Sequence, residues 1–549
     1  MPRRGLEPPR DYSHTLLKRT RLPIPPPGLH RKYTVLALLP YLLTTAGYIL
    51  LVSMAEKNTL SLSVPEFAVE VAQTLHSAGF EVYLVGGCVR GLIMGREVAD
   101  WDFTTNATPG QIQGLFEHTV YENDFGTVGV VLDGVPDGDS EHTVVEVTPY
   151  RKEKGYSDNR RPDAVVFCDS LDEDLSRRDF TINALAYNPV TEELVDRYGG
   201  IADLHLGVIR TVGDPAERFE EDALRLMRAV RIATQLHGSV EERTLQVIQE
   251  KSDALTSVAP ERIRDEFLKL IMADVPDTGI RLLLQTGLLT HIIPELLQGD
   301  GVEQSQAHRY DVLEHNIRTL AHSGVKQFRL EVRLAALLHD IGKPKTREWH
   351  EERGDWSFHA HEVVGARMVK KILQRLKFSK EVVDTVTLFV RWHMFFSDPD
   401  KVSLSGVRRM VARVGEQHIW DLIDLRMCDR IGTGRPKEQP YRLRKYVSLV
   451  EEVLREPVTP GTLVINGTML MQGIGLKPGP KIGHVLHILL AEVLDDPEKN
   501  VVDILLARAK ELLQLSEKDL AILGKKGKVR RFEEEEGQVA EIRRKYRVD

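Results

Sequence analysis

The sequence contains few cysteines, few aromatic side chains and no excess of positive charge. Only Cys88, Cys168 and Cys428 occur in 549 residues, and no two of them form a CxxC pair. A disulfide scaffold is therefore excluded, and a cysteine-built zinc site is not favoured. Aromatic residues make up 6% and the formal net charge is −8, so nucleic acid would have to bind in a local basic groove. The remaining composition, 42% hydrophobic and 28% charged, is that of a globular protein of several domains.

The first 53 residues differ from the rest of the chain. Residues 1–32 carry eight Lys or Arg and two acidic side chains, whereas residues 33–53 carry no charge. A charge-free segment of this length can cross a bilayer core of about 30 Å, and its basic flank would place the N-terminus inside. A signal anchor, a cleaved signal peptide and a start codon assigned upstream of Met54 remain open. The last is favoured because Met54 opens an ordinary globular sequence, and the cleaved peptide is less favoured because no A-x-A-like site follows.

A predicted strand that runs into two glycines indicates a phosphate-binding turn. Residues 63–80 have the apolar spacing of an amphipathic helix, and residues 81–85 predict a short buried strand. Gly86 and Gly87 follow this strand directly, and a helical segment with Arg90 comes next. Glycines let the backbone approach a phosphate, the helix N-terminus offers free N–H groups, and Arg90 adds positive charge. A tight turn is the plainer interpretation of the two glycines taken alone.

Two aspartates about ten residues further on predict a metal site. Asp100 and Asp102 alternate in a predicted strand, so their carboxylates point to the same side. Like charges this close usually need a cation, and Mg²⁺ binds one or two carboxylates together with substrate phosphates. Glu146, in another alternating strand, is a candidate third carboxylate, although a solvated strand face explains it equally well. The segment 151–167 is rich in Arg and Lys and predicts a basic loop near a nucleotide or an RNA backbone.

Four motifs in a fixed order resemble those of a known family. They are GGCVRG with DWDFTTNA, LSRRDFTINALA (175–186), DRYGG (196–200) and EDALR (221–225). Together they resemble the bacterial class II tRNA nucleotidyltransferase and poly(A) polymerase family over about residues 65–300. One position departs from the family pattern, because Gly91 stands where the first motif usually has aspartate. This departure leaves Arg90 and the paired carboxylates intact.

The resemblance implies roles in nucleotidyl transfer. Gly87 and Arg90 would contact the incoming triphosphate, and the paired carboxylates would hold catalytic Mg²⁺ ions. Arg178 would contact the nucleotide, with Asp179 nearby to favour a ribonucleotide. The two glycines of the DRYGG motif would form a flexible joint between a head and a neck.

The segment EDALRLMRAVR places four charged residues at every third position: Asp222, Arg225, Arg228 and Arg231. Spacing alone favours a charged helix face with an i,i+3 ion pair. In the family, the matching Asp and Arg hydrogen-bond the base edge of CTP or ATP, and the resemblance implies the same role here. The chemistry suits this role, because Asp accepts from an exocyclic amino group and Arg donates to ring acceptors. Cytosine and adenine carry that amino group and uracil does not.

A second set of potential metal ligands lies downstream, spread over about 115 residues in the order H…HD…H…H…D. Its members are His315, His339, Asp340, His361, His393 and Asp429. Imidazole and carboxylate groups are suitable ligands for Mn, Fe, Ni or Mg. The pattern resembles the HD phosphohydrolase superfamily, and LLHDIGK is its most specific part. The resemblance implies a metal that generates hydroxide to attack phosphorus, with His361 and His393 as second-metal ligands or phosphate contacts.

The C-terminal region after about residue 435 is less informative. It predicts helices around a Gly/Pro-rich turn, followed by a charged tail. Members of the resembled family carry a similar segment that helps to bind the tRNA elbow. By this resemblance, Lys477, Lys481 and His484 are candidates for phosphate contact.

The sequence thus predicts an α+β protein, with a small mixed-sheet nucleotidyltransferase head followed by an all-helical neck, an HD domain and a C-terminal helical region. The expected divisions are 1–53, 54–195, 196–300, 301–435 and 436–549. The expected function is template-independent addition of CMP and AMP to tRNA 3′-ends from CTP and ATP. Mg²⁺ is expected at the head, and a divalent transition metal or Mg²⁺ at the HD site. The expected location is the cytoplasm, with a membrane anchor only if residues 33–53 insert.

Three other functions remain open from the sequence. An A-adding enzyme or a poly(A) polymerase would carry the same motifs, because loop and neck geometry decide specificity. A metal-dependent phosphohydrolase whose head only holds RNA is a second alternative, and the intact Asp100 and Asp102 argue against it. A non-catalytic RNA-binding protein is the least favoured. No obligatory protein partner is implied.

Overall fold

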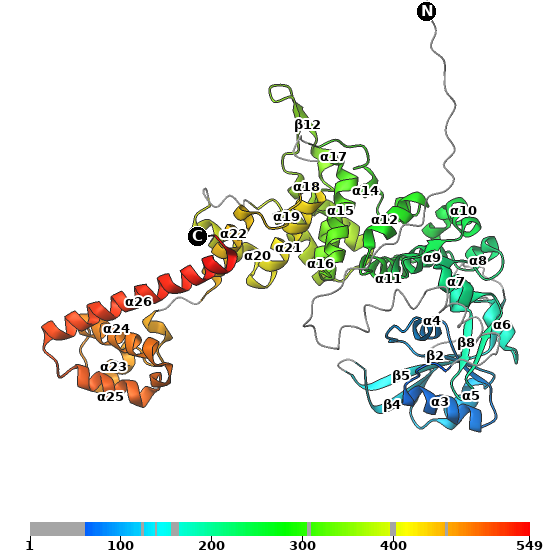
Figure 1. Ribbon diagram of the computed structural model, residues 1–549, viewed down its shortest axis with the longest axis horizontal. Helices are drawn as coiled ribbons and strands as arrows, with labels where there is room; N and C mark the ends of the chain where they lie inside the picture. Colours follow the sequence, from blue (N-terminus) through cyan, green and yellow to red (C-terminus); the bar gives the residue numbers. More distant parts are fainter. Residues whose placement is uncertain are drawn as a thin grey trace, which may run out of the picture. The chain divides into compact units, whose positions relative to one another are not determined.

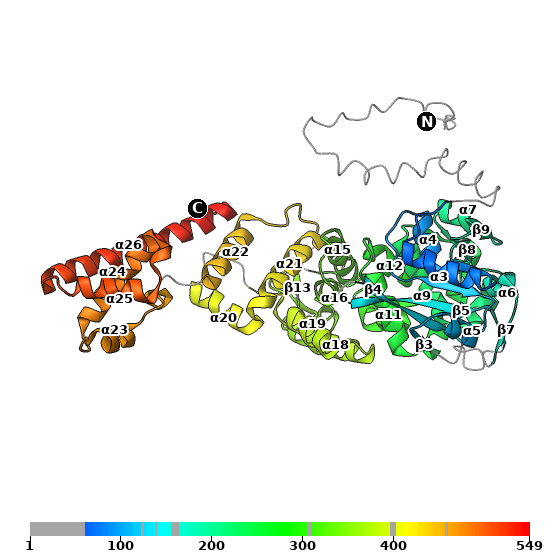
Figure 2. The same cartoon turned by 90° about the horizontal axis from the view of Figure 1, so that it is seen from below.

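The computed structural model describes residues 61–121, 126–137, 140–154, 164–304, 309–395, 402–455 and 459–548. The segment 1–53, with its uncharged stretch, and residues 155–163 of the basic loop lie outside the described residues. In the described part of the chain, no helix is long and apolar enough to cross a membrane. Leu62–Asp549 form one compact unit, which Figures 1 and 2 show from two sides.

The first part of this unit is a head built on a seven-stranded mixed sheet. The strand order is β3-β4-β5-β2-β1-β8-β9, and β2 runs parallel to β5 while the other neighbours are antiparallel. The strands are β1 (Val82–Val85), β2 (Asp102–Thr105), β3 (Thr119–Tyr121), β4 (Val128–Asp137), β5 (Ser140–Pro149), β8 (Leu185–Asn188) and β9 (Glu193–Asp196). The head also contains α3 (Glu66–Ser77), α4 (Gly87–Ile93), α5 (Pro109–Leu115), α6 (Leu171–Ser176) and the hairpin of β6 (Arg151–Lys154) and β7 (Ala164–Phe167). The mixed-sheet head is confirmed.

The pairing of β1 with β2 fixes the place of the glycine turn. Leu84 lies opposite Phe103 in an antiparallel register, so the end of β1 adjoins the start of β2. Gly86 leaves β1 with φ +76°, a conformation that glycine adopts without strain, and α4 begins at the next residue. The turn and Asp102 are therefore neighbours. The strand begins at Asp102, so Asp100 precedes it rather than alternating within it.

The neck that follows is mostly helical. Its elements are α7 (Gly200–Leu206), β10 (Val208–Ile209), α8 (Pro215–Glu221), α9 (Leu224–Gln235), β11 (Ser239–Val240), α10 (Glu242–Glu250), α11 (Pro260–Ile271), α12 (Pro276–Gln285), α13 (Leu289–Ile292) and α14 (Pro294–Leu297). A Cβ at Gly200 would overlap the carbonyl oxygen of Thr181. The expected flexible joint is thus a position where two backbones pack closely, and glycine is needed there for space.

The next region carries the second set of motifs on packed helices. Its elements are α15 (Val312–Val325), α16 (Leu330–Leu338), α17 (Lys343–Thr346), the hairpin β12 (Glu348–His350) and β13 (Asp355–Ser357), α18 (His361–Arg375), α19 (Lys380–Trp392), α20 (Leu404–Val414), α21 (Glu416–Gly432) and α22 (Tyr441–Leu454). One hydrophobic core runs from Phe180, through the neck helices, to Val450. The neck and this region are therefore joined by continuous apolar packing.

The C-terminal helices have a separate core. They are α23 (Gly467–Ile474), α24 (Pro480–Asp495), α25 (Val502–Leu512) and α26 (Glu517–Tyr546). Their buried cluster extends from Leu463 to Leu520. The long helix α26 packs on α24 and also meets α22.

Helices α15 and α21 cross at a glycine. A Cβ at Gly432 would overlap Thr319 Oγ1 and approach the carbonyl oxygen of His315. We expect Gly432→Ala to lower the free energy of unfolding by about 1–3 kcal/mol, the usual range for overpacking. Thermal unfolding measures this. Gly537→Ala is the control, because nothing lies within 4 Å of its Cβ on α26, and alanine there should be neutral or slightly stabilising. Equal melting temperatures for the two variants would contradict the tight crossing.

Candidate active sites

The structure brings the predicted phosphate and metal residues of the head into one cavity. Gly87, Arg90, Asp100 and Asp102 all line a cavity of about 390 Å³. The neck also contributes to its lining, at Gln235–Leu236 and Ala273–Asp274. The cavity therefore lies between the head and the neck, and a bound molecule would contact both.

The electrostatics of Asp102 favour a cation beside it. Burial raises the pKa of Asp102, the guanidinium of Arg178 lowers it, and the carboxylate of Asp100 raises it further. Arg178 Nη1 and Asp102 Oδ2 both lie close to Gly86, at 3.4 Å and 3.7 Å from its Cβ position. A divalent ion at the two carboxylates would relieve their repulsion and offset the burial of Asp102.

Glu146 lies opposite Asp102 on the parallel strand β5. Paired residues of neighbouring strands project to the same face of a sheet. The carboxylates of Asp102 and Glu146 therefore lie on the same face of neighbouring strands, as expected. Glu146 does not line the head cavity. Its role as a third carboxylate stays a prediction.

A chain of polar contacts links the glycine turn to the neck. Arg90 donates to Asn183 Oδ1, and Asn183 Nδ2 donates to Asp179 Oδ1 at 2.9 Å. Asp179 Oδ2 accepts from Arg228 Nε and Nη2 at 2.9 and 2.6 Å. Burial would raise the pKa of Asp179, but Arg228 and Asn183 outweigh it and hold this pKa below its ordinary value. Arg178, the neighbouring residue, is held by Asp174 at 3.0 Å.

The EDALR segment is not one continuous helix. Helix α8 ends at Glu221, Asp222 is extended with φ −146°, and α9 begins at Leu224. Asp222 Oδ1 accepts from the backbone N–H of Leu224 at 3.0 Å, a local bond that competes with helix continuation. The prediction of four charged residues on one helix face is therefore wrong for Asp222, which lies at the break.

The four side chains of this segment are all engaged in ion pairs, and Arg228 and Arg231 share one partner, Glu266. Asp222 is paired with Arg262, whose two Nη atoms lie 3.2 and 2.7 Å from its oxygens. Arg225 donates to Glu221 and to the carbonyl oxygen of Arg177. Arg228 bridges Asp179 and Glu266, at 2.6 and 3.7 Å.

Arg231 binds the other oxygen of Glu266 at 2.5 Å. Sequence reasoning missed Asn183, Arg262 and Glu266. Glu266 and Arg262 lie on α11, about 40 residues from their partners in the chain, so no local pattern could have found them. Asn183 was within a recognised motif but had no assigned role.

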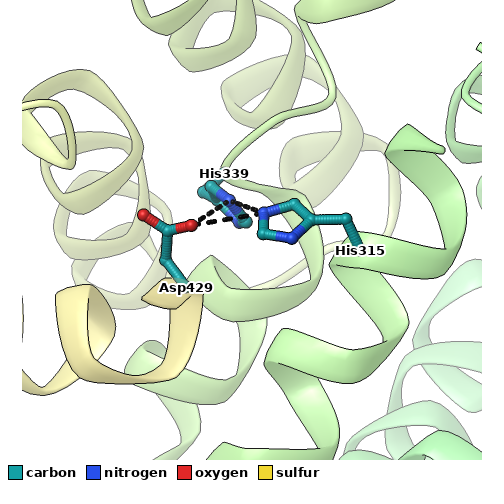
Figure 3. A group of neighbouring side chains, drawn as sticks. All are labelled: His315, His339 and Asp429. Carbon is teal, nitrogen blue, oxygen red and sulfur yellow. Dashed lines mark hydrogen bonds and ion pairs between the residues drawn. The ribbon is translucent and has the colours of Figure 1, made fainter. Parts of the chain in front are cut away.

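The six predicted His and Asp residues of the second site converge in two groups of three. The first group is His315, His339 and Asp429, which come from α15, the end of α16 and α21 (Figure 3). In it, His315 Nε2 lies 3.0 Å from His339 Nε2 and 3.3 Å from Asp429 Oδ1. The second group is Asp340, His361 and His393. All six side chains are buried.

Asp340 faces both groups. Its Oδ2 lies 3.3 Å from His315 Nε2 and 3.2 Å from His339 Nε2. Its Oδ1 lies 3.3 Å from His361 Nε2 and 3.5 Å from His393 Nε2. One carboxylate therefore stands between two sets of imidazoles, as a bridging ligand of a metal pair would.

The residues fit a pair of metal ions. Neighbouring ligands of an ion with bonds of about 2.1 Å are about 3 Å apart, as these atoms are. The Nδ1 atoms of His339, His361 and His393 lie 2.7–3.0 Å from backbone carbonyl oxygens. A carbonyl accepts a proton donor, so Nε2 of each neutral ring is left with the lone pair that binds a metal.

The titratable groups of this site shift the pKa values of one another. Burial lowers the pKa of His315, but hydrogen bonds to Asp340 and Asp429 outweigh it and raise this pKa to about 9. Burial, with the nearby His339, lowers the pKa of His393 to about 4 against the opposing effect of Asp340. The pKa of Asp429 is held well below its usual range because Arg426 and the histidines outweigh burial. The site thus has carboxylates that stay ionised.

A cavity of about 760 Å³ opens beside the two groups. Cations and aromatic rings share its lining with the ligands: Lys343, Arg426, Arg430, Arg435, Arg442, Trp356, Phe358 and Tyr441. Lys343 donates to Asp340 Oδ2 at 2.5 Å, and Arg426 donates to Asp429 Oδ2 at 2.6 Å. Positive charge around a metal site favours a phosphorylated substrate.

The three C-terminal candidates for phosphate contact are Lys477, Lys481 and His484, and the structure gives contacts for two of them. Lys481 forms an exposed ion pair with Glu517 at 2.5 Å. His484 packs against Gly524 of α26. Their contact with phosphate, like that of Lys477, stays a prediction.

Asp179→Asn tests the ion pair between head and neck. Because the pKa of Asp179 is lowered in the folded state, its stabilisation is full above the unfolded pKa of about 4 and is lost as the pH falls below it. We expect a loss of about 3 kcal/mol at pH 7, as for a broken buried pair. Melting temperatures from pH 7.5 to 3.5 should show the difference shrinking below pH 4. A difference that grows on acidification would contradict this. Asp172→Asn, which breaks an exposed pair with Arg197, should change little.

The number of bound ions tests the metal pair. We expect the native chain to bind two Mn²⁺ ions at the buried groups and to melt at a higher temperature with them. His361→Ala should lose one ion, and Asp340→Ala should weaken both, because this carboxylate faces both groups. Calorimetric titration and elemental analysis measure the stoichiometry. His418→Ala is the control, because His418 on α21 belongs to neither group and pairs with Asp421. Two ions retained by the Asp340 variant would exclude the bridging role.

Family models match three stretches of the chain. The model described as "Poly A polymerase head domain" matches residues 82–210, and "Probable RNA and SrmB- binding site of polymerase A" matches residues 239–299. The model described as "HD domain" matches residues 311–440. These stretches hold the head cavity, much of the neck and the two His/Asp groups.

Curated relatives are similar to most of the chain. The CCA-adding enzyme of Limosilactobacillus reuteri is 33% identical over 443 residues, which are 80% of this chain and 95% of that protein. The CCA-adding enzyme of Latilactobacillus sakei is 34% identical over 465 residues, 82% of this chain and 100% of that protein. Among solved structures, the Bacillus stearothermophilus CCA-adding enzyme in complex with CTP has a TM-score of 0.52 and 26% identity. The match covers 82% of this chain and 98% of that one.

Proposed function

The chain belongs to the family of CCA-adding enzymes, and we propose that it adds CMP and AMP to tRNA 3′-ends by template-independent nucleotidyl transfer. The observation that carries this is the head cavity, which unites Gly87, Arg90, Asp100 and Asp102. The substrates are then CTP, ATP and tRNA. An α+β architecture with a mixed-sheet head and mostly helical regions behind it accords with this family.

In the proposed reaction, the terminal 3′-hydroxyl of tRNA attacks the α-phosphorus of the nucleotide and pyrophosphate leaves. Arg90 and the N–H groups at the start of α4 bind the triphosphate. Asp100 and Asp102 would hold Mg²⁺, which when bound stabilises the charge that develops on the transferred and leaving groups. Catalysis by the chain is then mostly positioning and electrostatics.

We assign nucleotide choice to the break between α8 and α9. Asp222 Oδ2 accepts from Arg262 Nη2 at 2.7 Å, and the second lone pair of a carboxylate oxygen can accept from an exocyclic amino group. Arg225, held by Glu221, would donate to the ring acceptors. Arg228 and Arg231 are engaged with Glu266, so their contribution is to fix the helix that carries Arg225.

The second site supports a second proposal, a metal-dependent phosphohydrolase activity. The specific observation is Asp340 between two groups of buried ligands, next to a cavity lined with cations. Two metal ions held there would generate a hydroxide that attacks phosphorus. Lys343 and Arg426 are placed to orient the carboxylates and to bind phosphate. A 3′-end phosphate of RNA is the substrate class that would serve repair before addition.

We also propose the division into an N-terminal extension (1–53), head (54–195), neck (196–300), HD domain (301–435) and C-terminal region (436–549). The C-terminal helices would bind the tRNA elbow. A cytoplasmic location follows from the proposed substrates. The extension is dispensable for chemistry in this view, since the cavity is built from residues far beyond it.

The test uses purified full-length chain, Mg²⁺ and a tRNA transcript that ends at the discriminator base. CTP alone, ATP alone and both together are supplied, and the 3′-ends are sequenced. Growth by CC with CTP and by CCA with both supports the proposal. Growth only with ATP on a CC-ended transcript would make the chain an A-adding enzyme, and long A tails would make it a poly(A) polymerase. Repeating the assay with residues 54–549 tests the extension.

Two variants separate the two activities. We expect Asp102→Ala to lower nucleotide addition by more than about a thousandfold, as loss of a metal ligand does, and to leave phosphohydrolase activity unchanged. His339→Ala should have the reverse effect, because it removes a ligand of the first buried group. Initial rates of CMP addition and of phosphate release measure both. If either variant lost both activities while remaining folded, the two-site proposal would fail.

A further inference from the structure

Arg333 is the largest fully buried side chain of the described residues. It lies on α16, the helix that ends at His339 and Asp340. A buried guanidinium is costly unless its N–H groups find acceptors. The acceptors of Arg333 therefore show which segments of the chain this side chain holds together.

Most of the partners of Arg333 lie outside its own helix. Nη1 donates to the carbonyl oxygens of Ile271 and Ala273 at 3.1 and 2.7 Å, and Nε donates to that of Phe328 at 2.6 Å. Ile271 is the last residue of α11, so the cation satisfies carbonyls at the negative end of a neck helix. The contact ties α16 to the end of α11.

A second path runs from Arg333 through one amide side chain. Arg333 Nη2 donates to Gln327 Oε1 at 3.1 Å, and Gln327 Nε2 donates to Asp274 Oδ1 at 3.0 Å. The guanidinium therefore fixes Ala273 through the backbone and Asp274 through Gln327. Gly324 allows the approach, because a Cβ there would meet the Asp274 carbonyl oxygen at 2.9 Å.

Ala273 and Asp274 form part of the neck wall of the head cavity. These residues line the same cavity as Asp100 and Asp102, yet they are anchored by a residue of the HD region. The other end of the anchoring helix carries His339 and Asp340. One buried side chain connects the walls of the two candidate active sites.

We propose that Arg333 is a positioning residue of nucleotidyl transfer, which fixes the Ala273–Asp274 wall of the head cavity. This inference rests on the proposed function of that cavity. The HD region would then support nucleotide addition through Arg333, whether or not its own His and Asp residues catalyse a reaction. A displaced wall alters the volume that the nucleotide occupies and leaves the tRNA contacts elsewhere unchanged.

The test compares three full-length variants with the native chain in CMP addition to tRNA. Arg333→Lys keeps the charge but loses the forked donor geometry that reaches both carbonyls. Gln327→Glu keeps an acceptor for Arg333 but replaces the donor to Asp274 by a like charge. Arg329→Met is the matched control, because Arg329 directly precedes the same helix and pairs with Asp421, and neither residue lines the head cavity. Thermal unfolding defines a temperature at which every variant is folded.

We expect Arg333→Lys to raise the KM for CTP about tenfold and Gln327→Glu to raise it about threefold, the range for lost hydrogen bonds. The KM for tRNA should stay at the native value in both, and Arg329→Met should match the native chain. A smaller folded fraction would lower kcat and leave both KM values unchanged, so the KM for CTP separates positioning from instability.

An unchanged KM for CTP in folded Arg333→Lys overturns the inference and leaves the proposed function intact. If that variant does not fold, Gln327→Glu decides in the same way. A native chain that incorporates no nucleotide overturns both the proposed function and this inference. A raised KM for CTP in the deciding variant, with an unchanged KM for tRNA, supports it.

Discussion

The pairing of buried charge between the head and the neck is the constraint on which the rest of the structure depends. Asp179, Arg228 and Glu266 form a sequence of opposite charges from the head to α11. Asp179 and Glu266 are buried, and each would be costly without the guanidinium of Arg228. Because Arg90 joins this chain through Asn183, the glycine turn is held in place relative to the neck helices. Arg90 also lines the head cavity, so these ion pairs help to position one of its walls.

The second site also consists of buried charged groups that need partners, and they lie closer together than those between head and neck. Six titratable side chains are buried within a few ångströms, and their mutual hydrogen bonds raise the pKa of His315 to about 9. Lys343 and Arg426 neutralise part of the carboxylate charge. Burying so many titratable groups together is costly for stability alone, as in a site built to bind a ligand.

The sequence predicted the mixed-sheet head and the six His and Asp residues that the structure brings together, because both have local patterns. The strand before Gly86 and the apolar helix before His339 have clear patterns, and they lie where the patterns predict. The break at Asp222 was missed because the apolar and charged spacing continues across it. The partition of the six ligands into two groups, with Asp340 between them, depends on how helices cross. Arg262 and Glu266 were missed for the same reason, since contacts across about 40 residues leave no periodic trace.

The continuous hydrophobic core from Phe180 to Val450 has a consequence for how such a chain can change over time. A part that shares its apolar interior with its neighbour cannot be removed without leaving that neighbour's interior facing water. The helices of the HD domain could therefore lose all six of the His and Asp side chains and still be retained as scaffolding. Their chemistry could change or disappear, while the helices themselves persist because the neck packs against them.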